Sequence, residues 1–325
     1  MSTAGRDRFL GWLGSSGATV GVEIAPRRVT AVALSSQRGG VVSIGAHATE
    51  PLPDGALAPS LNAANLARRD ALVSALGRVL DQVGRPRRVA LVVPDTAAKV
   101  SLVRFDKVPS RPADLEAMIR WHVRKAAPFP IEQAQVAWTD GIDLADGGRE
   151  FVVVTMRRDV VQEYETACLA CGAHAGIVDL ATFNLVNLAL LASGGRTDAP
   201  SGDWLLVHLT PEYSTLAIVR GSRLVFYRNR LADAEGHLAD LVHQTAMYYE
   251  DRLGGGRFSR VVVAGGAAAV SSELASLRDT LEDRLHSPIE SLDVRRAATF
   301  SDRIDAPHEL LAALAAPVGL VLREA

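Results

Sequence analysis

A hairpin pattern that occurs twice constrains the fold of this chain more than any other feature. The stretch VEIAPRRVTAVAL begins at Val22, and VHLTPEYSTLAIV begins at Val207; each combines a short apolar strand, a turn with proline and a second, alternating strand. Pro26 and Pro211 occupy the same place in the two copies, 185 positions apart (211 − 26). Repeats this far apart predict two related halves rather than a solenoid. The alternative is two unrelated hairpins that each use a proline in the turn.

A strand buried on both faces is predicted after the hairpin in each half. RRVALVVP ends at Pro94, and RVVVAGG begins at Arg260; short continuous apolar runs of this kind are typical of such strands. Gly265 and Gly266, which end the second run, would let the backbone approach a ligand closely. A helix predicted behind them would offer free amides to an anion or to a ribose hydroxyl. Both glycines are therefore candidate ligand-binding residues.

Composition bounds the class of protein. The 325 residues leave room for two lobes with cores of their own, and a hydrophobic content of 48% is that of a globular chain. The net charge of -2 gives no basic field and the arginines are scattered, so we expect no nucleic-acid partner. No apolar run reaches the roughly 18 residues of a membrane span, and no signal peptide is recognised. Two cysteines in so long a chain fit a reducing compartment and predict a cytoplasmic protein.

The two cysteines, Cys168 and Cys171, form a CLAC motif on a predicted helix. A CxxC pair can support thiol redox chemistry or half of a zinc site. Because no second pair exists, small buried helix residues are the better interpretation. The histidines show no ligand spacing such as HExxH, and no GxSxG elbow occurs. The sequence therefore predicts no catalytic residue and no metal site.

An acidic residue, Asp179, lies between the two halves in AGIVDLATFNLVNLALL. Val178 is predicted to end a strand, and Asp179 is well placed to cap the helix that follows, by accepting from its first-turn amides. The alternative is an acid at a cleft that positions water or a metal.

The stretch between the first half and Asp179 contains a helix with clear boundaries. Pro112 suits a first helical turn, and one apolar face is predicted from helical spacing, made of Leu115, Met118, Ile119, His122 and Val123. Pro128 and Pro130 end the helix and force an extended segment. Phe129 is held between them as a rigid apolar side chain, which either completes a core or lines a groove for a partner peptide.

The order of these motifs resembles the actin-like ATPase superfamily, and within it the PilM family of cytoplasmic proteins in type IV pilus assembly. The most specific likeness is a strand, a helix-start pattern with Pro109 and Leu115, a helix that carries Trp121, and then PFPIE, which begins at Pro128. CLACGAHAGIVDLATFNLVN, HQTAMYYEDRLGGGRFSRVVVAGGAA and the ending APVGLVLRE are similar to further segments of the family. The likeness runs from about Gly21 to the end of the chain.

The resemblance implies an α/β, actin-like (ribonuclease H-like) fold of two lobes with an inserted small α+β subdomain. The expected parts are a flexible tail (1–15), the first lobe in two pieces (16–98 and 173–200), the inserted subdomain (99–172) and the second lobe (201–325). In the family the cytoplasmic tail of a single-pass partner, PilN, lies between the main lobe and the insert. Trp121, Pro128, Phe129 and Pro130 are therefore candidate partner-binding residues.

The resemblance also marks positions that would surround a nucleotide. They are Glu23, Ala25, Arg27, Asp179, His208, Thr210, Ser214, Thr215, Gly265 and Gly266. The first loop of the family reads roughly GIDIGSSSVK, and here it is GVEIAPRRVT, so Glu23 replaces the usual acid and Ala25 the glycine.

The second loop departs from the family as well. His208 replaces its usual acid and Thr210 its glycine, and Pro26 and Pro211 each remove an amide donor. Mg²⁺ requires hard oxygen ligands in octahedral geometry, for which a neutral imidazole is a poor substitute. Arg27 can attract phosphate as a charged fork or remain solvated. We therefore expect no cofactor or weakly bound ATP, with the need for magnesium left open.

The sequence thus predicts an adaptor with degenerate nucleotide loops, cytoplasmic and peripheral to the inner membrane. It would serve a type IV pilus or type II secretion platform by binding the tail of a PilN-like protein and other platform proteins, with a homo-oligomer as a further possibility. One alternative is an active PilM-type ATPase. Another is a carbohydrate kinase of the same superfold, which gives no account of the PFPIE insert.

Overall fold

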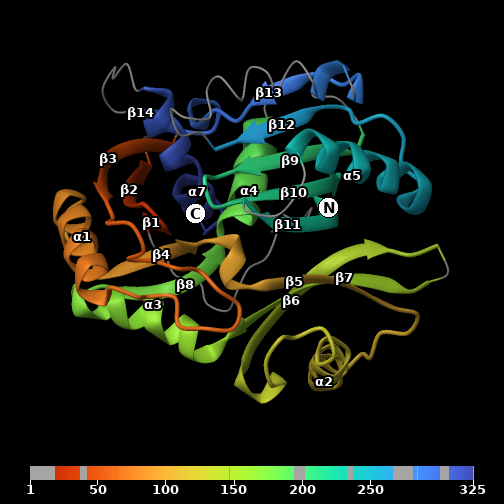
Figure 1. The fold of residues 1–325 in the computed structure, drawn as a ribbon, viewed down its shortest axis with the longest axis horizontal. Helices are drawn as coiled ribbons and strands as arrows, with labels where there is room; N and C mark the ends of the chain where they lie inside the picture. Colours follow the sequence, from red (N-terminus) through yellow and green to blue (C-terminus); the bar gives the residue numbers. More distant parts are fainter. Residues whose placement is uncertain are drawn as a thin grey trace, which may run out of the picture.

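The structure is a computed structural model, shown in Figure 1. It describes residues 19–36, 42–145, 147–193, 202–232, 237–265, 281–283, 285–300 and 307–324. The expected tail, 1–15, and Gly266 lie outside these residues. None of the helices in the described ranges is both long and apolar enough to cross a bilayer.

The first large sheet contains the first hairpin. Across this six-stranded sheet the order is β14 (Thr299–Phe300), β3 (Val42–Pro51), β2 (Arg28–Ser36), β1 (Val20–Ala25), β4 (Arg88–Val93) and β8 (His174–Leu180). β1, β2 and β3 pair antiparallel, whereas β4 and β8 continue the sheet in parallel with β1.

The second large sheet contains the second hairpin and repeats this topology. Its order is β11 (Arg223–Leu231), β10 (Tyr213–Arg220), β9 (Trp204–Leu209), β12 (Val261–Ala264) and β13 (Ile289–Ser291). β9, β10 and β11 are antiparallel, and β12 and β13 continue in parallel with β9. The two hairpins thus lie in separate sheets with the same strand order, as the predicted repeat requires.

Helices α4 (Ala181–Ser193) and α7 (His308–Glu324) pack against each other between the two large sheets (Figure 1). Their contact is so close that a Cβ on Gly319 would lie 2.0 Å from the carbonyl oxygen of Asn184. β9 is buried on both faces: Leu206 belongs to the core shared with these helices, and Leu205 and Val207 belong to a second core on the opposite face. Helix α5 (Leu238–Leu253) covers that second core.

The predicted insert contains a three-stranded sheet in the order β5 (Lys99–Phe105), β7 (Arg149–Arg157) and β6 (Ala134–Asp143). Helix α2 (Pro112–Val123) begins at the predicted proline and buries Ile119 and Val123 against this sheet. His122 was predicted on the same buried face but is exposed, with its ring edge-on to Phe105. This small unit lies below β11 at the lower right of Figure 1.

Helices α1 (Arg69–Gln82) and α3 (Arg158–Ala170) cover the first sheet. Although α3 falls within the predicted insert, 99–172, its buried side chains Val160, Tyr164 and Cys168 belong to the first core, which also takes in one face of β7, and not to the core between α2 and the small sheet. The expected limits of the lobes and of the insert stay predictions. Cys168 is buried in α3 and Cys171 caps its end, and both thiols are free.

Candidate functional site

A cavity of about 170 Å³ lies between the turns of the two repeated hairpins. The first residues of α4, the middle of α7 and Gly265 after β12 complete its wall. Gly265 has a φ of 99°, and a Cβ there would lie 2.0 Å from the carbonyl oxygen of Leu209. Only glycine fits this position, which brings the backbone after β12 against the second hairpin. Of the predicted nucleotide positions, the cavity is lined by Glu23, Ala25, Arg27, His208, Thr210 and Gly265.

The acid of the first hairpin is already paired. Glu23 is 7% exposed on β1, and its Oε2 accepts from Nη2 of Arg28 at 2.9 Å. Both residues belong to the same hairpin, on either side of the turn. The carboxylate that would face a ligand is therefore neutralised from within its own loop.

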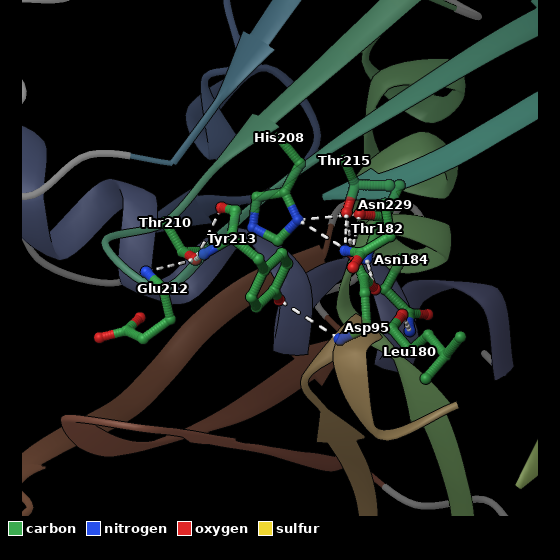
Figure 2. A network of polar contacts seen from close by, with 10 residues as sticks. All are labelled: Asp95, Leu180, Thr182, Asn184, His208, Thr210, Glu212, Tyr213, Thr215 and Asn229. Atoms are coloured by element: carbon green, nitrogen blue, oxygen red, sulfur yellow. Dashed lines mark hydrogen bonds and ion pairs between the residues drawn. The ribbon is translucent and has the colours of Figure 1, made fainter. Parts of the chain in front are cut away.

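The turn of the second hairpin is closed on itself by Thr210. The Thr210 hydroxyl donates to the carbonyl oxygen of Tyr213 at 2.9 Å and accepts from the amides of Glu212 and Tyr213 at 3.3 and 3.0 Å. Figure 2 shows these contacts around Thr210. A phosphate loop presents free backbone amides to its ligand, whereas here a side chain uses two of them.

An ion pair joins the two turns. Nε of Arg27 lies 2.8 Å from Oε1 of Glu212, and the two residues are 185 positions apart, so they occupy equivalent places in the repeat. The side chain of Arg27 is 64% exposed and that of Glu212 29%.

Behind the cavity, Asp95 is the centre of a buried polar network (Figure 2). Asp95 follows β4, in the short helix η1 (Asp95–Ala97). Its carboxylate accepts from the amide and hydroxyl of Thr182 and, at 2.7 Å, from the hydroxyl of Thr215. Nδ1 of His208 is 2.8 Å from the Thr182 hydroxyl oxygen and 3.4 Å from Asp95 Oδ2. Because the Thr182 proton is donated to Asp95, its oxygen accepts from Nδ1–H of His208.

The network fixes the charge of Asp95. Burial alone would raise its pKa, but the hydrogen bond and charge of His208, together with the hydrogen bonds of Thr182, outweigh burial and hold the pKa below its ordinary value. Asp95 was missed by the sequence analysis. An acid directly after a buried parallel strand is the signal that marks it, because side chains at the carboxyl ends of such strands gather at ligand sites.

Asp179 differs from its predicted capping role. It is the next-to-last residue of β8, and its Oδ2 pairs with Nη1 of Arg323 in α7 at 2.5 Å. The α4 amide of Thr182 is capped instead by Asp95. Asp179 does not line the cavity, and neither do Ser214, which is half-buried on β10, and Thr215, which belongs to the Asp95 network.

The predicted partner-binding residues differ in how far they are exposed. Trp121 is 68% exposed on α2, whereas Phe129 packs against the core of the small sheet, between the exposed Pro128 and Pro130. A separate hollow of about 100 Å³ lies between the small sheet and the first lobe. It is lined by Gln135, Met156, Val161, Glu165 and residues 175–178 of the edge strand β8.

Within the described ranges, no group of three or more His, Cys, Asp or Glu side chains is arranged to hold a metal ion. The structure therefore offers a small cavity with internally paired charges, and behind it a buried network that links both large sheets.

Comparison with known proteins places this arrangement in a family. A PilM–PilN type IV pilus biogenesis complex contains a chain with the same fold, at a TM-score of 0.78 and 19% identity over 96% of this chain and 99% of that one. A protein of Bacteroides thetaiotaomicron with an actin-like ATPase fold and unknown function superposes with a TM-score of 0.51 and 8% identity, covering 85% of this chain and 91% of that one.

No curated protein matches the chain at a significant level. The family profile described as type IV pilus assembly protein PilM matches residues 21–251. With this match over more than half of its length, the chain belongs to the PilM family and has the actin-like ATPase fold.

Proposed function

We propose that the chain is a scaffold on the cytoplasmic face of a type IV pilus or type II secretion platform, peripheral to the inner membrane through its partners. It binds the cytoplasmic tail of a PilN-like single-pass protein and leaves its nucleotide cleft degenerate. Membership of the PilM family and the likeness to a chain from a PilM–PilN complex support the pilus role. The observation that carries the adaptor proposal is that the polar side chains of the two hairpin turns are already engaged within the chain. Glu23 is bound by Arg28, Arg27 pairs with Glu212, and Thr210 binds the backbone of its own turn.

The cleft residues do not suit magnesium or a triphosphate. Glu23 is paired with Arg28, and a histidine stands where a second acid would be needed, although Mg²⁺ prefers several oxygen ligands. Thr210 uses two amides of the second turn, and Arg27 is engaged by Glu212. The cavity of about 170 Å³ is also smaller than the roughly 300–1,000 Å³ of ordinary ligand pockets.

An active ATPase is the second candidate, because the fold is that of actin-like ATPases. A carbohydrate kinase is disfavoured, since it does not explain the inserted sheet. Calorimetry with ATP, with and without Mg²⁺, separates the first two. We expect no binding in the low micromolar range under either condition, and a tight magnesium-dependent isotherm would replace the adaptor proposal by the ATPase.

The partner tail is proposed to bind between the insert and the first lobe. Residues 175–178 of β8 line the hollow there, and β8 is the last strand of its sheet. An edge strand presents unpaired backbone groups to which an extended peptide can add. Trp121 is a candidate anchor because large, partly exposed aromatic side chains dominate contact energies.

The partner proposal is tested by the affinity of the purified chain for a synthetic peptide of the PilN-like tail. Two variants are compared with the wild type, Val178→Lys in the hollow and Trp121→Ala on α2. Met247→Ala is the matched control, because Met247 is 51% exposed on α5 of the second lobe. We expect Val178→Lys to abolish binding and Trp121→Ala to weaken it by ~1–3 kcal/mol. Unchanged affinity in both variants would remove the partner site from this region.

A further inference from the structure

The Asp95 network lies where three parts of the chain meet. We call Asp95, Thr182, His208 and Thr215 the latch. Asp95 follows β4 of the first large sheet and is separated from β5 of the small sheet by three residues. Thr182 is in the first turn of α4. His208 and Thr215 face each other on β9 and β10 of the second large sheet.

Each side of the latch is fully desolvated. Asp95 is 1% exposed, Thr182 and Thr215 are 0% exposed and His208 is 5% exposed. Figure 2 shows His208, Thr215 and Thr182 gathered around the carboxylate of Asp95. A buried carboxylate needs all its hydrogen-bond partners, because water cannot replace a lost one. Separating the second sheet from Asp95 would therefore leave a charge with fewer partners.

The ion pair between the turns is a weaker connection. Arg27 and Glu212 lie at the mouth of the cleft, and the Arg27 side chain is 64% exposed. Exposed pairs contribute little and are screened by salt. Of these two polar connections between the sheets, the latch is the buried one, at the base of the cleft.

The small sheet is attached to both sides of the latch. On one side, β5 of the small sheet follows η1, which contains Asp95. At its other end, Ile142 of β6 packs against the second core, and Nη1 of Arg223 on β11 donates to the carbonyl oxygen of Asp140 at 2.9 Å. A change in the position of Asp95 relative to β10 must therefore be taken up by β5 or by these contacts.

We propose that the latch replaces a bound nucleotide as the link between the two large sheets, and that its opening is transmitted to the small sheet through β5. In this arrangement the chain holds its cleft closed without a ligand. The small sheet changes when the contacts of the second sheet to Asp95 are broken.

The test is hydrogen exchange measured by mass spectrometry on the ligand-free protein. Thr215→Val removes one of the second sheet's donors to Asp95, together with the oxygen that accepts from Nδ2 of Asn229 at 2.8 Å, and it keeps the side-chain shape and the contact between Asp95 and Thr182. Thr245→Val is the matched control, because Thr245 is also buried but donates only to Leu241 within α5. Thr215→Ser restores a hydroxyl.

We expect Thr215→Val to speed exchange in β9 and β10 and in β5 by about tenfold, which corresponds to about 1.4 kcal/mol. Thr215→Ser should return both regions to the wild-type rate, and Thr245→Val should change neither. Faster exchange confined to β9 and β10, with β5 unchanged, would show that opening of the latch is not transmitted to the small sheet. Unchanged exchange everywhere would overturn the latch. Because no nucleotide or tail peptide is used, these outcomes are independent of whether the adaptor proposal holds.

Discussion

The ion pair between Asp179 and Arg323 is the buried contact whose loss should be most costly to stability. It joins the end of β8 to the last turn of α7, with 2.5 Å between Oδ2 and Nη1. The side chain of Arg323 is 3% exposed and that of Asp179 is 7% exposed. Arg323 also donates from Nε to Glu324 at 3.0 Å, and Asp179 accepts from the amide of Leu180 at 2.7 Å.

Arg323→Met keeps the length and apolar part of the side chain and removes its charge. Asp179 would then stay buried beside the Leu180 amide and the Asn184 side chain, with no cation. Removing one partner of a buried ion pair costs about 3–5 kcal/mol, because an uncompensated charge remains. We expect the free energy of unfolding, measured in urea, to fall by about that amount.

The double variant Asp179→Asn/Arg323→Met supplies the control. Replacing both charges by neutral groups is often close to neutral in stability, so the double variant should recover most of the loss. A single variant that loses less than about 1 kcal/mol would refute the reasoning, and so would a double variant as unstable as the single one.

The pH dependence has a definite sign. Burial raises the pKa of Asp179, and Arg323 opposes that rise. An acid with a raised folded-state pKa binds protons more readily when folded, so its contribution to stability is present at low pH and lost as pH rises through the folded-state pKa. Without Arg323 that pKa rises further. The deficit of Arg323→Met relative to the wild type should therefore be smaller at pH 5 than at pH 8.

Three further predictions concern packing and the thiols. Gly319→Ala should destabilise the protein by about 1–3 kcal/mol, because the new Cβ would meet the Asn184 carbonyl. Gly77→Ala in α1 should stabilise it by about 0.5–1 kcal/mol, because the new Cβ has no neighbour closer than 4.0 Å. Both changes are measured by unfolding in urea. Burial raises the pKa of Cys168 to about 12, so in a Cys171→Ser background a thiol reagent should label the protein at pH 8 only after unfolding; labelling of the native variant would contradict the buried thiol. Phe129→Ala should lower stability by about 1–3 kcal/mol, less than a fully buried phenylalanine, and a melting temperature equal to the wild type would assign Phe129 to the surface.

The architecture could be predicted from local patterns because the fold repeats them. The hairpins at Val22 and Val207 both show the alternation of apolar and polar residues that is typical of strands. The apolar segments that follow them form the parallel strands β4 and β12. Pro112 placed the start of α2 correctly because a proline at the first helical turn is a local signal. His122 was placed on the buried face because helical spacing alone does not show how wide that face is.

The contacts that define the site could not be predicted, because their partners are far apart in sequence. Asp179 precedes a helix, which suggested a cap, but Arg323 lies 144 positions later and takes its carboxylate. Asp95 accepts from Thr215 across 120 positions, and neither residue has a neighbour in sequence that indicates the contact. Hydrogen bonds of this kind form when two sheets come together. The hydrophobic pattern predicts the strands and their buried faces, but it does not predict individual contacts between the sheets.

The repeat explains why the two turns can meet at all. Two copies related by an internal repeat bring equivalent positions together, so identical ionised residues at the contact would repel. Here the equivalent positions have diverged to opposite charge, Arg27 in the first turn and Glu212 in the second, and they pair at 2.8 Å. The residues where the family resemblance predicts acids are also held: Glu23 by Arg28 of its own hairpin, and His208 by the latch. In both cases the polar group is paired with another group of the chain itself. We propose this internal pairing as the physical basis for a cleft that closes without a ligand.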